Sequence, residues 1–272
     1  MALTINTNTA SLSAQKNLAS SQGALSNSFQ KLSSGLRVNS AADDAAGLAV
    51  SESMKSQIRS YTVAQRNAAD GISMAQTAEG ALGQVHDVLG RMRELAMQAS
   101  NGSLGDTDRG YLNTEFSSLK DEIDRIQKSS KFNGTSLVNS TGASINFQVG
   151  LGNTASDHIT VTFGGVDVST VAAAAVSSAT TALNALASID STIQNVSNAR
   201  AKFGTAMNRL QYATSSIATM SVNLSAANSR IVDVDVANET AAMSRNQVLS
   251  QAGVSVLAQA NQLPQMALSL LR

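Results

Sequence analysis

The residues best suited to chemistry are few in this sequence, and their spacing fits no common catalytic or metal site. The two histidines, His86 and His158, stand far apart, and neither belongs to a His-Glu-x-x-His motif. We expect both to be structural, because a metal site needs several ligands at a defined spacing. The absence of cysteine excludes thiolate catalysis, disulfides and cysteine–zinc sites. The sequence predicts no metal site.

Two further groups invite a functional interpretation, a carboxylate pair and a set of glycines. Asp43 and Asp44 have no accompanying nucleophile, base or cation site, so we interpret them as a cap and salt bridge at a helix start. The glycines between positions 150 and 165 are not followed by Lys-Ser/Thr, so they fit a hairpin connection better than a phosphate loop. We predict no catalytic residue and no cofactor, and we expect that the protein is not an enzyme.

Composition excludes several other classes of protein. The 19 basic and 19 acidic residues balance, which argues against a nucleic-acid-binding surface. Only 14% of residues are charged, against about 25% in a typical domain, so we expect much of the surface to meet other protein. No apolar run is long enough to cross a membrane. We expect no signal peptide, because the first residues lack its basic and apolar regions. These features fit a cytosolic protein, and equally one exported without a cleaved signal.

The strongest pattern is a heptad repeat in the second half of the chain. Apolar residues follow one another at steps of seven: Ile189, Val196, Phe203, Leu210, Ile217, Leu224 and Ile231. A shorter row stands three residues ahead: Leu186, Ile193 and Met207. Both rows lie on one side of a helix, which runs for about 65 Å between residues 186 and 231. A rod needs a helix of that length, and a globular core rarely does.

The first half of the chain supplies partners for this helix. The same spacing runs from 54 to 96, and a shorter stripe runs from 112 to 126 after a break at Asn101-Gly102. Between 144 and 165, alternation predicts a β-hairpin. Its inward residues are Ile145, Phe147, Val149, Ile159, Val161 and Phe163. We therefore predict a mainly α fold, an elongated antiparallel helical bundle of the coiled-coil kind with a small β-hairpin region.

The two ends of the chain are periodic but almost uncharged. Residues 1–42 contain no acid, and residues 246–271 contain no charge. Their apolar rows are Leu18, Leu25, Phe29, Leu32, Leu36, Leu249, Val256, Leu263 and Leu270. Short helices with so narrow an apolar seam are marginal in water. We infer that both ends are disordered in the free monomer and fold when copies assemble, and that these rows pack the paired terminal helices.

Motifs at both ends resemble those of bacterial flagellins. The opening Ile5-Asn6-Thr7-Asn8 and the long run 32–48, LSSGLRVNSAADDAAGL, resemble the start of the family. The runs 256–262, VLAQANQ, and 268–272, LSLLR, resemble its end, and Phe147-Gln148-Val149-Gly150 resembles its internal hairpin region. The sequence is similar to a short form that lacks the outer variable domains.

This resemblance implies a structural subunit of the flagellar filament used in swimming. It implies an inner-tube domain of paired terminal helices, 1–42 with 228–272, and an outer bundle, 43–227. It also implies unfolded export through the flagellar type III apparatus with a chaperone, and an extracellular location. The expected partners are identical copies, the filament cap and hook-junction proteins, with no nucleic acid and no membrane insertion. A hook–filament junction or adaptor protein is the alternative.

A charged segment near residue 90 suggests a contact surface. Its residues, with one from the next helix, are Leu89, Arg91, Glu94, Leu95, Gln98 and Glu115. From the periodicity we expect Leu89 to face the bundle and Leu95 to face outward between charged residues. An exposed leucine in such a place suggests a subunit contact. The resemblance implies that this patch is read by the vertebrate Toll-like receptor 5, although Gly90 departs from the glutamine common there.

A second segment, from Gln30 to about Val50, is similar to the one that plant receptor kinases sense. Asp43, Asp44 and Gly47 stand in matching places. The alternative interpretation is a hinge between the inner and outer domains, and the two are compatible.

Overall fold

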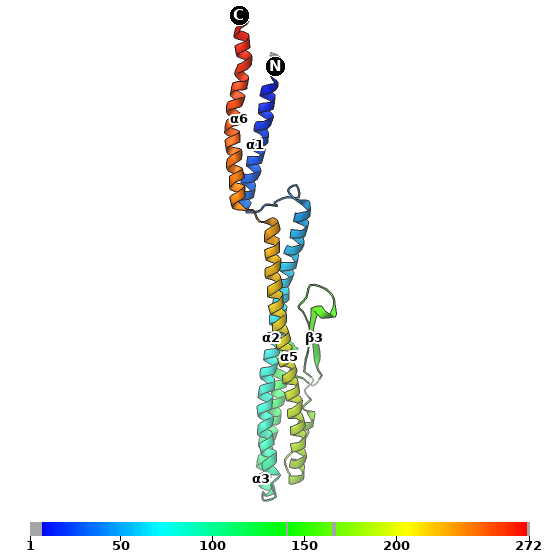
Figure 1. Cartoon of the computed structure of the whole chain (residues 1–272). Helices are drawn as coiled ribbons and strands as arrows, with labels where there is room; N and C mark the ends of the chain where they lie inside the picture. The colour runs from blue at the N-terminus through cyan, green and yellow to red at the C-terminus, as the bar shows by residue number, and fades with distance from the viewer. Residues whose placement is uncertain (1–6, 140, 165–166, 271–272) are drawn as a thin grey trace. The chain divides into compact units, whose positions relative to one another are not determined.

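The computed structural model describes residues 7–139, 141–164 and 167–270. It divides into two compact units. Unit 1 is Met1–Ser56 with Asn223–Arg272, and unit 2 is Gln57–Val222 (Figure 1). The boundaries between these units, after residues 56 and 222, differ from the predicted boundaries after residues 42 and 227. They fall within α2 (Ala45–Ala99) and α5 (Ala179–Val232), because both helices continue without a break and contribute residues to both units.

Unit 1 is built on two antiparallel helices, α1 (Thr9–Ser34) and α6 (Val236–Leu270). At one end the Asn8 side chain donates to the carbonyl of Ala260, 2.8 Å away. At the other end the backbone N–H of Arg37 donates to the carbonyl of Val232, 2.6 Å away. Helix α1 stops at Gly35, whose φ of +72° lies in the left-handed region that favours glycine. The sequence predicts a helical pair here, and the structure contains one.

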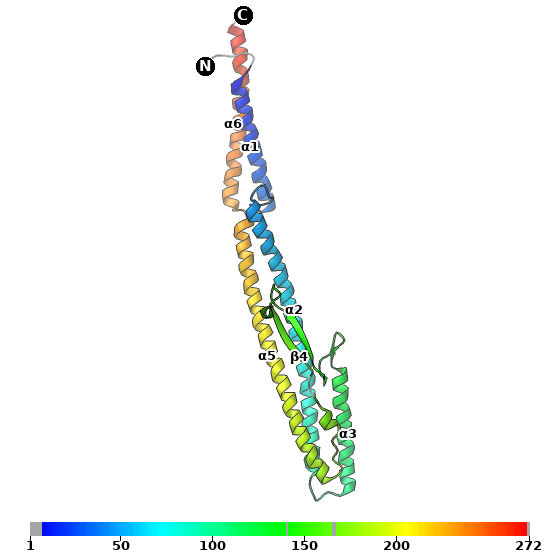
Figure 2. The same cartoon turned by 90° about the vertical axis from the view of Figure 1, so that its right-hand side faces the viewer.

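Unit 2 is a helical bundle in which α2 and α5 run antiparallel along each other, with α3 (Asp106–Ser129) beside α2 (Figure 2). Contacts between α2 and α5 fix their register. They are Tyr61 to Met220 at 3.2 Å, Glu79 to Arg200 at 2.6 Å and Asp190 to Arg93 at 2.7 Å. The predicted three-helix bundle is therefore confirmed. Helix α5 begins earlier than the predicted seam, and a short helix α4 (Ser169–Ala172) precedes it.

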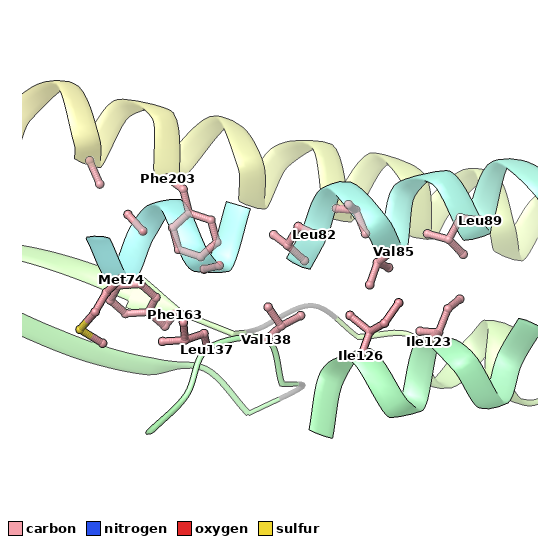
Figure 3. Close-up of a cluster of buried hydrophobic side chains, with 14 of the residues drawn as sticks. Met74, Leu82, Val85, Leu89, Ile123, Ile126, Leu137, Val138, Phe163 and Phe203 are labelled. Carbon is pink, nitrogen blue, oxygen red and sulfur yellow. The ribbon is translucent and has the colours of Figure 1, made fainter. Parts of the chain in front are cut away.

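The buried core of unit 2 is formed by the apolar rows that the heptads predict. Figure 3 shows Leu82, Val85 and Leu89 of α2 facing Ile123 and Ile126 of α3. The largest buried side chains within the described residues include Phe116, Phe163, Phe203, Leu82, Leu89 and Leu210. Burial of such side chains contributes about 1.5–3 kcal/mol each, so the rows hold the helices together.

The hairpin consists of β3 (Ala143–Gln148) and β4 (His158–Phe163), which pair antiparallel with Phe147 opposite Ile159. The predicted alternation is confirmed for these strands, and Val149 follows directly after β3. A two-stranded hairpin is marginal alone, but this one packs on the helices. Phe163 stacks on Phe203 of α5 with ring centroids 5.4 Å apart.

A smaller hairpin precedes it, formed by β1 (Lys131–Phe132) and β2 (Thr135–Ser136). Asn133 and Gly134 form its turn, with φ of +46° and +81°. Asn-Gly is the usual pair where both turn residues need positive φ.

Gly71 marks the place where α2 passes closest to the hairpin and α5. A Cβ on Gly71 would lie 3.0 Å from Leu210 Cδ1 and 3.0 Å from Phe147 Cδ1. We expect Gly71→Ala to lower the free energy of unfolding by about 1–2 kcal/mol, because overpacking outweighs the gain in helix propensity.

The matched control is Gly80→Ala in the same helix, where a Cβ meets no atom within 4 Å. This change should raise the free energy of unfolding by about 0.5–1 kcal/mol. Urea unfolding of both variants checks the prediction, and equal stability of the two would contradict it.

Candidate interaction surfaces

Within residues 7–139, 141–164 and 167–270, no group of three or more His, Cys, Asp or Glu is placed to hold a metal ion. No helix in the same part of the chain is both long and apolar enough to cross a membrane. His86 lies in α2 and His158 begins β4. The sequence-predicted site residues lie on three surfaces, two in unit 1 and one in unit 2.

The first surface is the α1–α6 pair. On α1, Leu18, Leu25 and Leu32 are half-buried, as is Leu36 just beyond the helix. Leu18 lies against α6, with its Cδ1 3.3 Å from where a Cβ on Gly253 would stand. Phe29, predicted in the same row, is instead 67% exposed. Phe29 directly follows Ser28, which is buried, so its side chain points to another side of the helix.

On α6 the predicted packing row lies on the other side of the helix. Leu249 is 50% exposed and Val256 is 54% exposed. The side toward α1 instead carries Gly253, Leu257 and the buried Ala260. Small residues let the two helices approach closely. The heptad pattern instead predicted that the row with the largest side chains would face α1. Leu263 and Leu270 belong to α6 but lie outside the residues whose side chains the structure describes.

The result is that the terminal pair presents apolar side chains outward. These exposed residues of α1 and α6 are Leu12, Phe29, Val236, Val248, Leu249, Val254 and Val256. Exposed apolar groups of this number on one helical pair are typical of an interaction surface. Among the described residues, the α1–α6 pair has no buried apolar cluster like that of unit 2, and Ala260 is its one buried apolar residue.

The second surface is the segment between α1 and α2. The carboxylate of Asp43 accepts hydrogen bonds from the backbone N–H groups of Ser40 (2.9 Å) and Asn39 (3.1 Å). These bonds, that of Ser40 first, lower the pKa of Asp43 below its usual value. Asp44 accepts from the N–H of Gly47 at 2.8 Å and so caps α2. A Cβ on Gly47 would collide with the Asp44 carboxylate.

The capping interpretation is therefore confirmed for Asp44 and wrong for Asp43, whose carboxylate binds backbone N–H groups of the preceding turn rather than those of the first turn of α2. The expected salt bridge is not among the ion pairs of the described residues. Backbone N–H groups take its place as partners of the carboxylates, which fixes the local turn without a basic side chain.

The third surface lies where α2 passes α3. The guanidinium of Arg91 donates to Glu115 at 2.8 and 2.9 Å and to Glu94 at 2.9 Å. All three side chains are largely exposed, as is Gln98. The hydrogen bond to Glu94, and then that to Glu115, raises the pKa of Arg91 above its usual value. The structure thus brings together the charged residues that the sequence predicts as one patch.

The outward orientation predicted for Leu95 is wrong. Leu95 is 1% exposed and belongs to the core of unit 2, as does Leu89. The reason is the third helix: α2 packs on α3 as well as on α5, so its buried side is wider than one heptad seam. The patch is charged and polar, without an apolar centre.

Comparison with known proteins places these surfaces in a family. Residues 5–143 match the bacterial flagellin N-terminal helical region, and residues 186–271 match the bacterial flagellin C-terminal helical region. The chain is 43% identical to a flagellin of Halalkalibacterium halodurans, covering 98% of this chain and 99% of that one. It is 40% identical to a flagellin of Bacillus subtilis, with the same coverage. The chain belongs to the bacterial flagellin family.

Solved structures agree on the fold. The crystal structure of Bacillus cereus flagellin is similar with a TM-score of 0.50 and 35% identity, covering 60% of this chain and 94% of that one. A putative flagellar hook-associated protein of Vibrio parahaemolyticus has a TM-score of 0.57 at 18% identity, covering 70% of this chain and all of that one. The second likeness concerns the fold alone. At 272 residues, this chain is a short member of its family.

Proposed function

We propose that copies of this chain polymerise into the bacterial flagellar filament that drives swimming. Membership of the flagellin family over nearly the whole chain carries this proposal. In this role the α1–α6 pair packs the inner tube and unit 2 forms the outer wall. The exposed apolar residues of the pair support that division, because a filament interior would cover them.

The partners follow from this role. The chain leaves the cell through the flagellar export apparatus, held by an export chaperone, and joins the filament beneath its cap, outside the cell. Hook-junction proteins meet the first subunits. The low charge of both ends supports this route, because segments without a stable core of their own suit export in an unfolded state.

Seeded growth tests the proposal against the adaptor alternative. Purified monomers added to short filament seeds should elongate them into long filaments, because each added copy presents the same surface again. An adaptor adds once and stops. Monomers that bind seeds without elongating them would favour the hook–filament junction role.

The monomer also has a proposed second role, as a ligand of Toll-like receptor 5. Arg91, Glu94, Gln98 and Glu115 form its exposed contact patch, and buried Leu89 and Leu95 shape the helix beneath it. The support is the family resemblance together with the observed clustering of the charged side chains. Residues 30–50, with Asp43, Asp44 and Gly47, are the proposed plant-sensed segment. A synthetic peptide of these residues that is inert on plant cells would refute that role.

Arg91→Ala should weaken receptor signalling strongly. We expect the half-maximal concentration of monomer to rise by about tenfold or more, because arginines at the centre of an interface are common hot spots. A reporter-cell assay with purified monomer measures it. The matched control is Arg125→Ala, an exposed arginine of α3 that also pairs with a glutamate, Glu122. Equal potency of both variants and the unmodified protein would sink the receptor role.

A further inference from the structure

The loop that joins α2 to α3 (Figure 2) contains an asparagine followed directly by a glycine, Asn101 and Gly102. Both residues are exposed to solvent. In such a pair the glycine nitrogen can attack the asparagine side chain, because glycine has no Cβ that would crowd the approach. Whether the attack is fast or slow depends on the groups that surround the pair.

Arg109 of α3 places a positive charge beside the peptide bond between these two residues. It is only 7% exposed, and its Nη2 donates to the main-chain carbonyl of Asn101 at 3.0 Å. The backbone N–H of Leu104 donates to the same oxygen at 3.4 Å. This carbonyl shares its peptide group with the Gly102 nitrogen, and resonance spreads charge between the two atoms. Donors at the oxygen therefore stabilise the nitrogen after it has lost its proton.

Another donor is directed at the Asn101 side chain. The backbone N–H of Ser103 donates to Oδ1 of Asn101 at 3.2 Å. Such a bond to the backbone two residues on folds the side chain back over the main chain, toward the Gly102 nitrogen. Attack at Cγ turns Oδ1 into an oxyanion, which the same N–H stabilises. The Gly102 N–H itself donates no hydrogen bond among the described residues, so none has to break before it reacts.

We propose that Asn101 deamidates without an enzyme, in a reaction that Arg109 and the Ser103 N–H accelerate. The Gly102 nitrogen gives its proton to water and forms a bond to Cγ of Asn101. The bond between Cγ and Nδ2 then breaks, and Nδ2 takes up a proton and leaves as ammonia. Water opens the resulting five-membered imide at either of its carbonyls, which leaves aspartate or isoaspartate at position 101.

A second pair of the same type, Asn133 and Gly134, provides a control within the chain. These residues form the turn between β1 and β2, and both have positive φ. Strand pairing holds the turn directly on both sides, with Phe132 opposite Thr135. Because the attacking nitrogen must move toward the side chain, reaction at this turn requires the hairpin to open. The fold should therefore slow this pair while it accelerates the other.

Mass spectrometry of the folded, full-length monomer during incubation at neutral pH measures the conversion of each amide to an acid. Synthetic peptides of residues 97–106 and 129–138 give the rate of each pair without the fold. We expect Asn101 to react about tenfold or more faster in the protein than in its peptide, which corresponds to a barrier lower by about 1.4 kcal/mol. Asn133 should react more slowly in the protein than in its peptide. A rate for Asn101 no higher than that of its peptide would overturn the proposal.

Gly102→Ala tests the nucleophile. A Cβ on Gly102 would meet no atom within 4 Å, so the loop has room for the change. Conversion of Asn101 should nevertheless slow, because the new methyl group crowds the attacking nitrogen. Conversion as fast as in the unmodified protein would contradict attack by this nitrogen.

Two further variants test the donors separately. Arg109→Gln removes the charge at the carbonyl, and Ser103→Pro removes the N–H at Oδ1. Each should bring the rate of Asn101 to within about threefold of the rate of its peptide. The matched control is Arg125→Gln, an exposed arginine of the same helix, which should leave the rate unchanged.

Circular dichroism checks that each variant is folded, and Ser103→Pro decides the question should Arg109→Gln fail to fold. An unaltered rate in the folded donor variants would overturn the assisted reaction. None of these measurements involves filament growth, so their failure would leave the proposed filament function intact.

Discussion

Removal of both chain ends should abolish filament growth and leave the melting of unit 2 unchanged. The truncation deletes residues 1–42 and 246–272. The buried apolar cluster of the structure extends from Ala64 to Ile217 and so belongs to unit 2. Unit 1 contributes few buried apolar residues, Val38, Val232 and Ala260 among those described. The ends therefore add little to the stability of the core, yet they expose six large apolar side chains, those of Leu12, Phe29, Val248, Leu249, Val254 and Val256.

Circular dichroism and seeded growth measure the two parts of this prediction. The sequence predicts that the ends fold on assembly, so full-length and truncated monomers should show similar total helix and the same main transition. Truncated protein should not elongate seeds. A large extra helical signal from α1 and α6 in the free monomer would contradict the coupled folding, and growth of the truncated protein would contradict the role of the ends.

A milder variant tests the same surface without deleting it. Leu249→Ser with Val256→Ser alters two side chains that are about half exposed, so the monomer should melt unchanged. Growth should nevertheless weaken, because both residues are covered in the proposed filament. Growth equal to that of the unmodified chain would show that this side of α6 does not face another copy.

Phe203→Ala should be among the most destabilising single substitutions. Phe203 is 2% exposed, stacks on Phe163 and lies on the α5 seam (Figure 3). Its truncation leaves a cavity between the hairpin and the helices, and the expected loss is about 3–5 kcal/mol in the free energy of unfolding. Urea unfolding measures the loss.

Tyr212→Ala is the matched control, because Tyr212 is an aromatic residue of the same helix that is 78% exposed. Its change should stay within about 0.5 kcal/mol. A double-mutant cycle with Phe163→Ala should give a coupling of about 0.5–1.5 kcal/mol for the stacked pair. Equal losses for Phe203→Ala and Tyr212→Ala would contradict the packing described for the hairpin.

The parts of the fold that were predictable from sequence are those where one periodicity dominates. The α5 row from Ile189 to Ile217 is buried as predicted, because its heptad spacing selects one side of a long helix. The buried face of the hairpin was predictable for the same reason. Strict alternation between Ile145 and Phe147, and again from Ile159 to Phe163, leaves only one face that can be buried.

The environment of the site residues was less predictable, because it depends on which other helices pack against them. Leu95 lies off the main seam of α2, and only the docking of α3 explains its burial. On α6 several heptad rows are equally regular. The row of small residues around Gly253 faces α1, and Leu249 and Val256 do not. The reason is that Leu18 approaches α6 closely at a position without a side chain.

A groove between β4 and α5, lined by Thr160, Thr162, Lys202 and Arg209, could not have been found from sequence. Lys202 and Arg209 read as ordinary exposed positions of a long helix, and no local motif relates them to Thr160 and Thr162. Their juxtaposition arises from the docking of the hairpin on α5, a contact between segments about 40 residues apart.

A cryo-electron microscopy map of filaments grown from this chain alone would show where the terminal helices lie. We predict a tube whose inner wall is formed by α1 and α6, with Phe29, Leu249 and Val256 against neighbouring copies and unit 2 on the outside. A filament whose terminal helices lie on its outer surface, with those side chains still exposed to solvent, would contradict it.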